Sequence, residues 1–462
     1  MNRIASIDIL RGLAICGMIL CANIGWNSDL PAWMFHAQVP PPDYMFRPDI
    51  PGITWVDLVF PFFLFSMGAA FPFALEKRIA SGQPMHRIIL GLVKRWAILA
   101  AFSIVLGNGY AARGADANRF VIYLFQILAW MAMFLSLTRF SFRKAGLSGL
   151  LNLSGVILIG ALAVFQEYVL GVPLSKSHSD IIIMILAYVA LFGGLIWLAS
   201  RNSPSLRWMI LIAISAVKAI TAYAPQIFSF MPETGNTWIG WIFDWAFLQY
   251  LVIALAGSIA GDLILSAKKK AAANTAAGSG TAGLWMAILA LLTVVFQLWG
   301  LFTRHVAADM AVTIVSATVF ILMTFRKREL WSDITAIGYL FLVTGIVFDP
   351  IDGGITKDHC NLSYLFTTSG MAAMTTGFLI CLESRHGIKS AILSECGQNP
   401  MIAYTVTNFM TAPILSATGI LQLIDSWAVG SPFMGIVRGV FITGIMMAVT
   451  IFFTRKKIFW RS

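Results

Sequence analysis

The chain has 462 residues, of which 58% are hydrophobic and only 11% are charged, whereas soluble proteins carry about 25% charged residues. This composition excludes an ordinary soluble protein and is typical of a chain that resides in a lipid bilayer. The net charge of +11 does not indicate a nucleic-acid partner, because the basic residues follow the pattern of a membrane topology.

Long apolar runs recur along the whole chain, and a helix needs about 20 such residues to cross a bilayer. They predict fourteen spans, at residues 9–25, 56–75, 88–106, 119–138, 147–168, 182–200, 206–223, 240–261, 283–302, 307–325, 333–348, 362–382, 399–421 and 433–454. Helices satisfy their own backbone hydrogen bonds in lipid. We therefore expect an all-α polytopic membrane protein, a bundle of roughly 10–14 transmembrane helices.

The charges between these spans alternate in sign. If the N-terminus lies in the cytoplasm, the inside segments carry most basic residues, including Lys94, Arg95 and Lys268. The outside loops then carry mostly acidic residues, including Asp349 and Asp358. This is the positive-inside pattern, and it predicts a multi-pass protein of the inner, cytoplasmic membrane. Because the number of predicted spans is even, we expect both termini in the cytoplasm.

No polar stretch is long enough for a separate soluble domain, so we expect one membrane domain over residues 1–462, surrounded by membrane lipid. The Ala- and Gly-rich segment 267–282 (AKKKAAANTAAGSGTA) predicts a flexible cytoplasmic linker. The five cysteines show neither a disulfide framework nor a metal-binding spacing, and no Walker, GxGxxG or HExxH motif occurs. We expect no bound metal, and an ATP-driven pump is disfavoured.

The first predicted span opens at its cytoplasmic end with the polar run Ser6-Ile7-Asp8-Ile9-Leu10-Arg11-Gly12. Asp8 and Arg11 are three residues apart and therefore lie on one face of a helix, where they can form an ion pair. Such a pair either fixes the topology of the helix or places Arg11 near the phosphates of an anionic cytoplasmic ligand. Asn23 closes this helix on the outer side.

The first outer loop carries Trp33 and His36, and the chain re-enters the membrane through Thr54 and Asp57. Thr54 is placed to cap the second helix, and a carboxylate such as Asp57 favours a helix N-terminus. Histidine is the side chain that acts most easily as a general base near neutral pH, and a nearby carboxylate orients its ring. Because Asn23 and Asp57 lie at helix ends on the side that carries His36, the three are candidates for one catalytic site.

A second polar loop is predicted at residues 348–359, between two late spans. Besides three aspartates, it carries Lys357 and His359. Acidic residues with aromatic neighbours suit a sugar, particularly a cationic glucosamine, and His359 is the candidate base if His36 is not. The alternative is a solvated loop without a role in binding.

The ordered motifs of residues 6–68 resemble the signature of heparan-α-glucosaminide N-acetyltransferase and its bacterial relatives. The likeness comprises Ser6-Ile7-Asp8-x-x-Arg11-Gly12, an asparagine that closes the first helix, Trp-x-x-His, and Gly-x-Thr-x-x-Asp-Leu-Val-Phe-Pro-x-Phe-x-Phe-x-Met-Gly at residues 52–68. Weaker likenesses follow at Gln126, where isoleucine replaces the arginine of the family's Gln-Arg-Leu segment, at Asn361-Leu362-Ser363-Tyr364, and around Asn399. The loop between the histidine and the Gly-x-Thr run is longer than in the family.

The resemblance implies a transmembrane acetyltransferase that transfers the acetyl group of cytoplasmic acetyl-CoA to an amino sugar of the glucosamine type, or to a glycan, on the extracytoplasmic side. It implies His36 as the catalytic histidine, either general base or acyl carrier, beside Asp57 and Asn23. The residues expected to bind acetyl-CoA are Arg11, Lys94, Arg95 and Gln126. Those expected to bind the acceptor are Trp33, Lys357, His359 and Asn399. The resemblance is also compatible with a homodimer.

Three other functions are open on the sequence. A secondary transporter or permease for a small sugar-like solute is favoured by the many spans and by Lys218, Asp309 and Arg438, which lie near or within spans. The second is an acetyltransferase that acts on a hydroxyl group of a surface polysaccharide or lipid-linked glycan, and the third is a non-catalytic subunit of an envelope assembly. Acetyl-CoA binding together with a requirement for His36 distinguishes an acetyltransferase from a transporter or a scaffold.

Overall fold

The computed structural model describes residues 5–138, 146–175, 177–228, 242–271, 282–326 and 328–460. Regular structure in these ranges is helical without any strand, and the sole extended pairing there is an isolated bridge between Thr138 and Trp460. Thirteen helices within the same ranges are long and apolar enough to cross a membrane. They confirm the predicted all-α polytopic membrane protein.

The helices that form these candidate spans follow one another along the chain. They are α1 (Ala5–Asn23), α2 (Val59–Ala80), α3 (Met85–Ala111), α4 (Arg119–Leu137), α5 (Leu147–Tyr168), α6 (Ile181–Tyr188) continued by the π-helical turn η4 (Val189–Gly193) and α7 (Gly194–Ser200), α8 (Pro204–Tyr223), α10 (Trp245–Leu248) with α11 (Leu251–Ala271), α12 (Ala282–Thr303), α13 (Val306–Thr324), α14 (Leu330–Phe348), α15 (Leu362–His386) and α20 (Pro432–Arg455). Shorter pieces are η1 (Ala32–Met34), η2 (Trp55–Leu58), η3 (Ala112–Gly114), η5 (Pro225–Phe228), α16 (Ala391–Gln398) and α19 (Ile420–Ala428).

The segment 399–421 is not among the thirteen, in contrast to the prediction of a span there. Its helix changes character along its length, because α17 (Pro400–Val406) leads into the π-helical turn η6 (Thr407–Thr411) before α18 (Ala412–Ala417) continues. Asn408 and four threonines within the segment lower its apolar character. The expected position of both termini in the cytoplasm depended on an even number of spans and stays a prediction.

Contacts between distant segments divide the chain into two compact units. The first comprises Met1–Ala14, Pro31–Leu92 and Tyr188–Ser394, and the second comprises Ile15–Leu30, Val93–Ala187 and Glu395–Ser462. All but one of the boundaries fall inside helices; the exception, between Leu30 and Pro31, lies in the loop after α1. The expectation of one membrane domain did not include this division, because no local sequence signal accompanies it.

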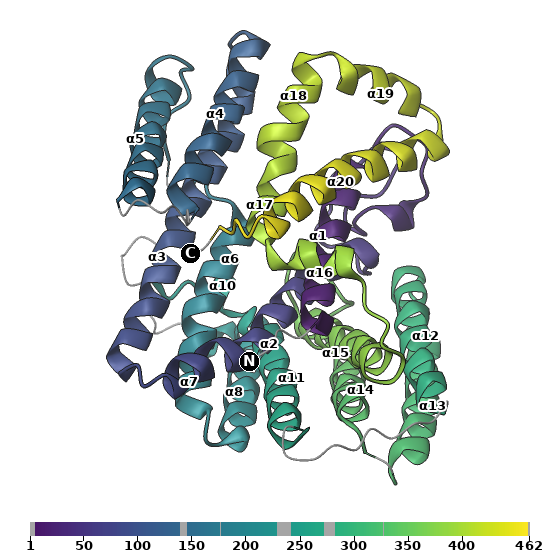
Figure 1. The fold of residues 1–462 in the computed structure, drawn as a ribbon. Coiled ribbons are helices and arrows are strands. Elements are labelled where there is room, and N and C mark those ends of the chain that lie inside the picture. Colours follow the sequence, from purple (N-terminus) through teal and green to yellow (C-terminus); the bar gives the residue numbers. More distant parts are fainter. Residues whose placement is uncertain are drawn as a thin grey trace. The chain divides into compact units, whose positions relative to one another are not determined.

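Close helix packing in the first unit depends on small residues. A β-carbon on Gly68 of α2 would lie 1.9 Å from the backbone oxygen of Ala254 in α11, and one on Gly257 would lie 2.1 Å from that of Phe65. α14 and α15 also lie side by side (Figure 1). Small residues at such contacts let membrane helices associate through van der Waals packing. This packing holds α2 and α15, whose N-terminal ends carry the site described below.

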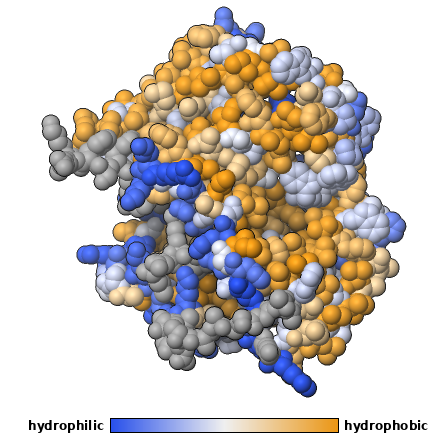
Figure 2. Space-filling view, turned by 45° about the vertical axis from the view of Figure 1, so that its right-hand side comes forward, coloured by the Kyte–Doolittle hydropathy of each residue, from blue (hydrophilic) through white to orange (hydrophobic). Residues whose placement is uncertain are grey.

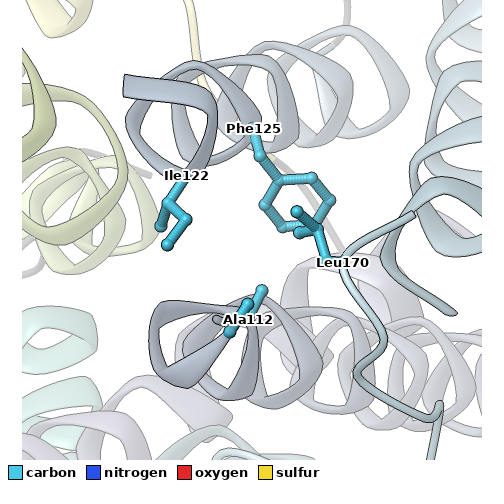
Figure 3. Packing of buried hydrophobic residues seen from close by; sticks show 5 residues of the cluster. Ala112, Ile122, Phe125 and Leu170 are labelled. Carbon is cyan, nitrogen blue, oxygen red and sulfur yellow. The ribbon is translucent and has the colours of Figure 1, made fainter. Parts of the chain in front are cut away.

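The second unit has an apolar core around α4 and α5, which lie side by side (Figure 1). Ala112, Ile122, Phe125 and Leu170 form a buried cluster, in which two side chains of α4 face residues that directly follow α3 and α5 (Figure 3). Phe125 also lines a mainly apolar cavity of about 290 Å³ between α3, α4 and α5. Phe125 therefore belongs both to the buried cluster and to the apolar wall of this cavity.

Large apolar side chains are exposed on several helices, for example Leu150 and Ile157 on α5 and Leu322 on α13. Figure 2 shows a face of the molecule on which hydrophobic residues, in orange, cover much of the surface. Soluble monomers rarely expose continuous apolar surface of this extent. The surface is that expected for helices in contact with lipid.

The segment 267–282, predicted as a flexible linker, overlaps the end of α11. α11 continues to Ala271 and has Lys268, Lys269 and Lys270 in its last turn, where cations favour a helix C-terminus. α12 begins at Ala282, and residues 272–281 lie outside the described ranges. The lysine-rich start of this segment, residues 267–271, therefore extends a helix.

Candidate active site

His36, Asp57 and Lys357 lie together in the first unit. His36 follows η1, Asp57 belongs to η2, and Lys357 is part of the loop between α14 and α15. His36 Nδ1 is 2.6 Å from Asp57 Oδ1. Lys357 Nζ is 3.2 Å from His36 Nδ1 and 3.8 Å from Asp57 Oδ1. The expected proximity of His36 and Asp57 is therefore present, and Lys357, expected only as an acceptor contact, lies beside both.

The Asp57 carboxylate is buried and held by the start of its own helix. Oδ2 accepts a hydrogen bond from the Thr54 N–H at 2.9 Å, and the Thr54 hydroxyl accepts one from the Val56 N–H at 3.3 Å, as in a capping box. Thr54 Oγ1 donates to the backbone oxygen of Phe35 at 2.7 Å. Because Phe35 precedes His36, one threonine positions both the carboxylate and the segment that carries the histidine.

The start of α15 supports the same residue from another direction. The Tyr364 hydroxyl donates to the backbone oxygen of Asp57 at 2.9 Å. Asn361, the N-cap of α15, accepts a hydrogen bond from the Tyr364 N–H at 3.1 Å. The sequence shows Asn361-Leu362-Ser363-Tyr364 as a weak family likeness but does not indicate that this segment contacts Asp57.

The loop that carries Lys357 is anchored by a bidentate ion pair that the sequence does not reveal. Arg304, in the turn between α12 and α13, donates to both carboxylate oxygens of Asp349, at 2.9 and 2.6 Å. Asp349 Oδ2 also accepts from the Ile355 N–H at 2.8 Å, and the Ile355 oxygen accepts from the Gly52 N–H at 2.7 Å. Bidentate Arg–carboxylate pairs are geometrically specific. The loop is therefore tied both to the α12–α13 pair and to the segment before η2.

The short contact between His36 and Asp57 determines the tautomer of the ring. A nitrogen and a carboxylate oxygen 2.6 Å apart share a proton, so we assign the hydrogen to Nδ1, which leaves Nε2 of the neutral ring with a free lone pair. The His36 side chain is 31% exposed, whereas that of Asp57 is 0% exposed. No described residue forms a hydrogen bond with Nε2. In this arrangement a carboxylate orients a histidine for proton transfer.

His359 lies in the same loop as Lys357 but in a solvated environment. Its Nε2 is 2.8 Å from Asp49 Oδ1, and the two side chains are 54% and 89% exposed. Trp33, another expected acceptor contact of this unit, is also exposed. Cys360, the residue that follows His359, is buried, and burial raises the pKa of its thiol to about 12.

Arg11, in the first unit, forms the ion pair with Asp8 that its spacing predicted, at 3.5 Å. Its guanidinium also donates to the backbone oxygen of Ser66 at 3.2 Å, which links α1 to α2. Arg11 is therefore part of the helix packing. Its contact with acetyl-CoA stays a prediction.

Asn23 and Asn399 belong to the second unit, and both use their side-chain amides in hydrogen bonds to backbone oxygens of that unit. Asn23 Nδ2 donates to the backbone oxygen of Ile19 at 2.8 Å, and its own backbone oxygen accepts from Arg438. Asn399 is buried and donates to the backbone oxygen of Ile458 at 2.8 Å. Their expected roles in catalysis and acceptor binding stay predictions.

The other residues expected to bind acetyl-CoA are also in the second unit. Lys94 is exposed and Arg95 half-buried on α3. Gln126 is buried in α4, and its Nε2 has no hydrogen-bond partner in the described part of the chain. No group of three or more His, Cys, Asp or Glu residues that could hold a metal ion occurs within the described ranges.

The fold and this site define the class of the protein, a polytopic helical membrane protein with a buried carboxylate–histidine pair. Residues 3–264 match the family described as Domain of unknown function (DUF5009), a stretch that covers more than half of the chain. The chain therefore belongs to this family. The matched stretch contains His36 and Asp57 and ends before Lys357. No curated protein matches the chain.

Proposed function

We propose that this protein is a transmembrane acetyltransferase in which His36 acts as the general base. The observation that carries the proposal is the 2.6 Å contact between His36 Nδ1 and the buried Asp57 carboxylate. The resemblance of residues 6–68 to the heparan-α-glucosaminide N-acetyltransferase signature supports the same activity.

In the proposed reaction, the free Nε2 of His36 takes the proton of the acceptor amine or hydroxyl while that group attacks the carbonyl carbon of the acetyl thioester. The carbon–sulfur bond breaks, a carbon–nitrogen or carbon–oxygen bond forms, and His36 passes the proton to the departing sulfur. Asp57 stabilises the imidazolium between the two proton transfers. If His36 carries the acyl group instead, the same Nε2 is the nucleophile.

Lys357 adds a cation to the site. An ammonium group has three donors, and its position 3.2 Å from His36 Nδ1 leaves donors for an acceptor hydroxyl or for the negative charge that develops on the carbonyl oxygen. Its charge also offsets that of the buried Asp57. Both effects support a role for Lys357 in the reaction as well as in acceptor binding.

The donor in this proposal is cytoplasmic acetyl-CoA, and the acceptor is an extracytoplasmic amino sugar of the glucosamine type or a glycan. The phosphates of CoA suit a basic cytoplasmic face, with Arg11, Lys94, Arg95 and Gln126 as the proposed contacts. The positive-inside pattern supports an inner-membrane location with both termini in the cytoplasm.

Transfer of label from acetyl-CoA to glucosamine by the detergent-purified full-length protein tests the proposal. We expect His36→Ala to lower transfer by about 10²–10⁴-fold. Acetyl-CoA binding, measured separately, should persist in this variant because His36 is not among the proposed CoA contacts. Well-folded wild-type protein that does not bind acetyl-CoA would contradict the proposal.

A secondary transporter is the second candidate, and one observation favours it. Asp309 lies in the first turn of α13 and is fully buried, and ionisable residues inside membrane helices often bind transported ions or protons. Solute counterflow in liposomes that needs neither acetyl-CoA nor His36 would support transport. Acetyl transfer by the same preparation would support the enzyme.

A further inference from the structure

Asp309 is a buried carboxyl group without a partner. Its residue is 0% exposed, and neither Oδ1 nor Oδ2 has a hydrogen-bond partner in the described part of the chain. The carboxyl packs against Gly300 of α12, where a β-carbon would lie 1.9 Å from Asp309 Oδ1. The absence of a side chain at position 300 thus provides the space that the carboxyl occupies.

Gln297 adds a second unpartnered atom at the same helix contact. Its Nε2 donates to the backbone oxygen of Asp309 at 3.0 Å, whereas its buried Oε1 has no partner among the described residues. If Asp309 is ionised, the two side chains present three buried oxygen acceptors for which the described residues supply no donor. Buried acceptors are normally paired, and leaving them unpaired is unfavourable.

The other titratable groups near Asp309 do not supply the missing donor. Arg304 and Asp349 act on it electrostatically but are hydrogen-bonded to each other. The side chain of His305, the N-cap of α13, forms a hydrogen bond with Thr303. The hydroxyl of Tyr339 in α14 forms one with Thr293. The pocket around the carboxyl therefore contains acceptors that no described donor satisfies and that a proton, a bound cation or a buried water could satisfy.

We propose that Asp309 binds a proton and is a neutral carboxylic acid in the folded protein. An isolated ionised carboxylate is strongly disfavoured in a protein interior, whereas a protonated carboxylic acid is uncharged and carries an O–H that can donate a hydrogen bond to a buried acceptor. A proton fits better than a metal cation, because hard cations such as Ca²⁺ and Mg²⁺ require about six oxygen ligands.

This proton site bears on the candidate active site, whichever reaction that site performs. Loss of the proton would place a negative charge beside the Arg304–Asp349 ion pair, so Arg304 would be shared between two carboxylates. Asp349 anchors the loop that carries Lys357. Ionisation of Asp309 is therefore expected to loosen this loop.

Difference infrared spectroscopy of the full-length protein tests the proposal. Wild type minus Asp309→Asn, near pH 6, should contain the carbonyl stretching band of a protonated carboxylic acid, and this band should weaken as the pH is raised. The control, Asp333→Asn, removes a half-buried carboxylate in the first turn of α14 and should give no such band. The Asp309 band should be equal in sodium chloride and choline chloride. A spectrum without the band, or a band that sodium abolishes, would overturn the proposal.

Carbodiimide labelling of the wild type requires no variant and therefore covers the case in which Asp309→Asn does not fold. Dicyclohexylcarbodiimide reacts with protonated carboxyl groups in apolar surroundings. Peptide mapping should find Asp309 labelled at least about tenfold faster near pH 6 than near pH 9, and the ion-paired Asp349 unlabelled. Labelling of Asp309 at a rate independent of pH, or no labelling at all, would overturn the proposal.

Discussion

The first unit holds two histidine–carboxylate pairs with nearly equal distances and different surroundings. His36 is 2.6 Å from Asp57, and His359 is 2.8 Å from Asp49. The Asp57 side chain is 0% exposed, whereas that of Asp49 is 89% exposed. Hydrogen-bond distance alone therefore does not separate a site for chemistry from a surface contact.

The difference lies in what holds the carboxylate. Thr54 and Tyr364 hold Asp57 through two hydrogen bonds: one from the Thr54 N–H to its carboxylate and one from the Tyr364 hydroxyl to its backbone oxygen. Solvent surrounds Asp49, and exposed ion pairs contribute little because water and salt compete for both partners. A fixed carboxylate keeps the histidine ring in one tautomer and orientation throughout a reaction. The proposal assigns the chemistry to His36 for this reason.

The largest effect is expected when the buried carboxylate, Asp57, is neutralised, and neutralising the exposed Asp49 serves as the comparison. Asp57→Asn preserves size but cannot stabilise an imidazolium, so acetyl transfer should fall by about 10²–10⁴-fold. Asp49→Asn, the matched control, should change transfer by less than about twofold, because an exposed pair is weak. Initial rates at saturating acetyl-CoA measure both. Equal losses in the two variants would show that burial does not distinguish the pairs.

Removal of the neighbouring cation should have the next largest effect. Lys357→Met eliminates the ammonium 3.2 Å from His36 Nδ1 while keeping an unbranched side chain, and transfer should fall by about tenfold or more. Lys357→Arg should restore part of the activity, because it restores the charge. Separate measurement of kcat and KM shows whether the lysine acts in the reaction or in acceptor binding. Unchanged values for both constants in Lys357→Met would exclude either role.

The cap that holds Asp57 should contribute a measurable part of the stability. Thr54→Ala removes the hydroxyl that bonds both Phe35 and the η2 start, and should lower the free energy of unfolding by about 1–2 kcal/mol. Thr54→Ser should be close to wild type. Ser431→Ala, which removes the cap of α20 in the second unit, should lower stability without a comparable loss of transfer. Thermal unfolding in detergent measures the stability of the three variants and the wild type. Wild-type stability of Thr54→Ala would contradict a stabilising role for this cap.

The smallest effect concerns the buried thiol next to the exposed histidine. Since burial raises the pKa of Cys360 to about 12, the folded protein keeps a proton that an unfolded chain releases near pH 8.5. The thiol should therefore contribute stability that declines as the pH rises through this range. Near pH 8, iodoacetamide should modify Cys360 in unfolded protein but not in folded protein, as measured by peptide mass spectrometry. Equal modification rates in folded and unfolded protein would show that the Cys360 thiol is accessible in the folded state and would contradict its burial.

The sequence predicts what depends on local pattern. Apolar runs identify the helices, and Thr54 and Asp57 sit at a recognisable helix start, so their proximity to His36 follows from residues close in the chain. The same patterns mislead at 399–421, where apolar residues are interrupted by Asn408 and threonines.

Long-range contacts are the part that sequence patterns do not predict. Lys357 reaches His36 across 321 residues, and no periodicity or motif records this contact. The Arg304–Asp349 pair and the missing partner of Asp309 likewise depend on how α12, α13 and α14 pack. The division into two units has the same origin, since each is assembled from segments far apart in the chain.

The comparison of the two histidines is the most direct test of the central claim. Acetyl transfer should be measured for wild type, His36→Ala and His359→Ala in parallel, with acetyl-CoA binding as the control for folding. We expect His36→Ala to lose about 10²-fold or more of the transfer activity, and His359→Ala to retain most of it. A loss confined to His359→Ala, or equal activity in all three proteins, would contradict the assignment of the chemistry to the buried pair.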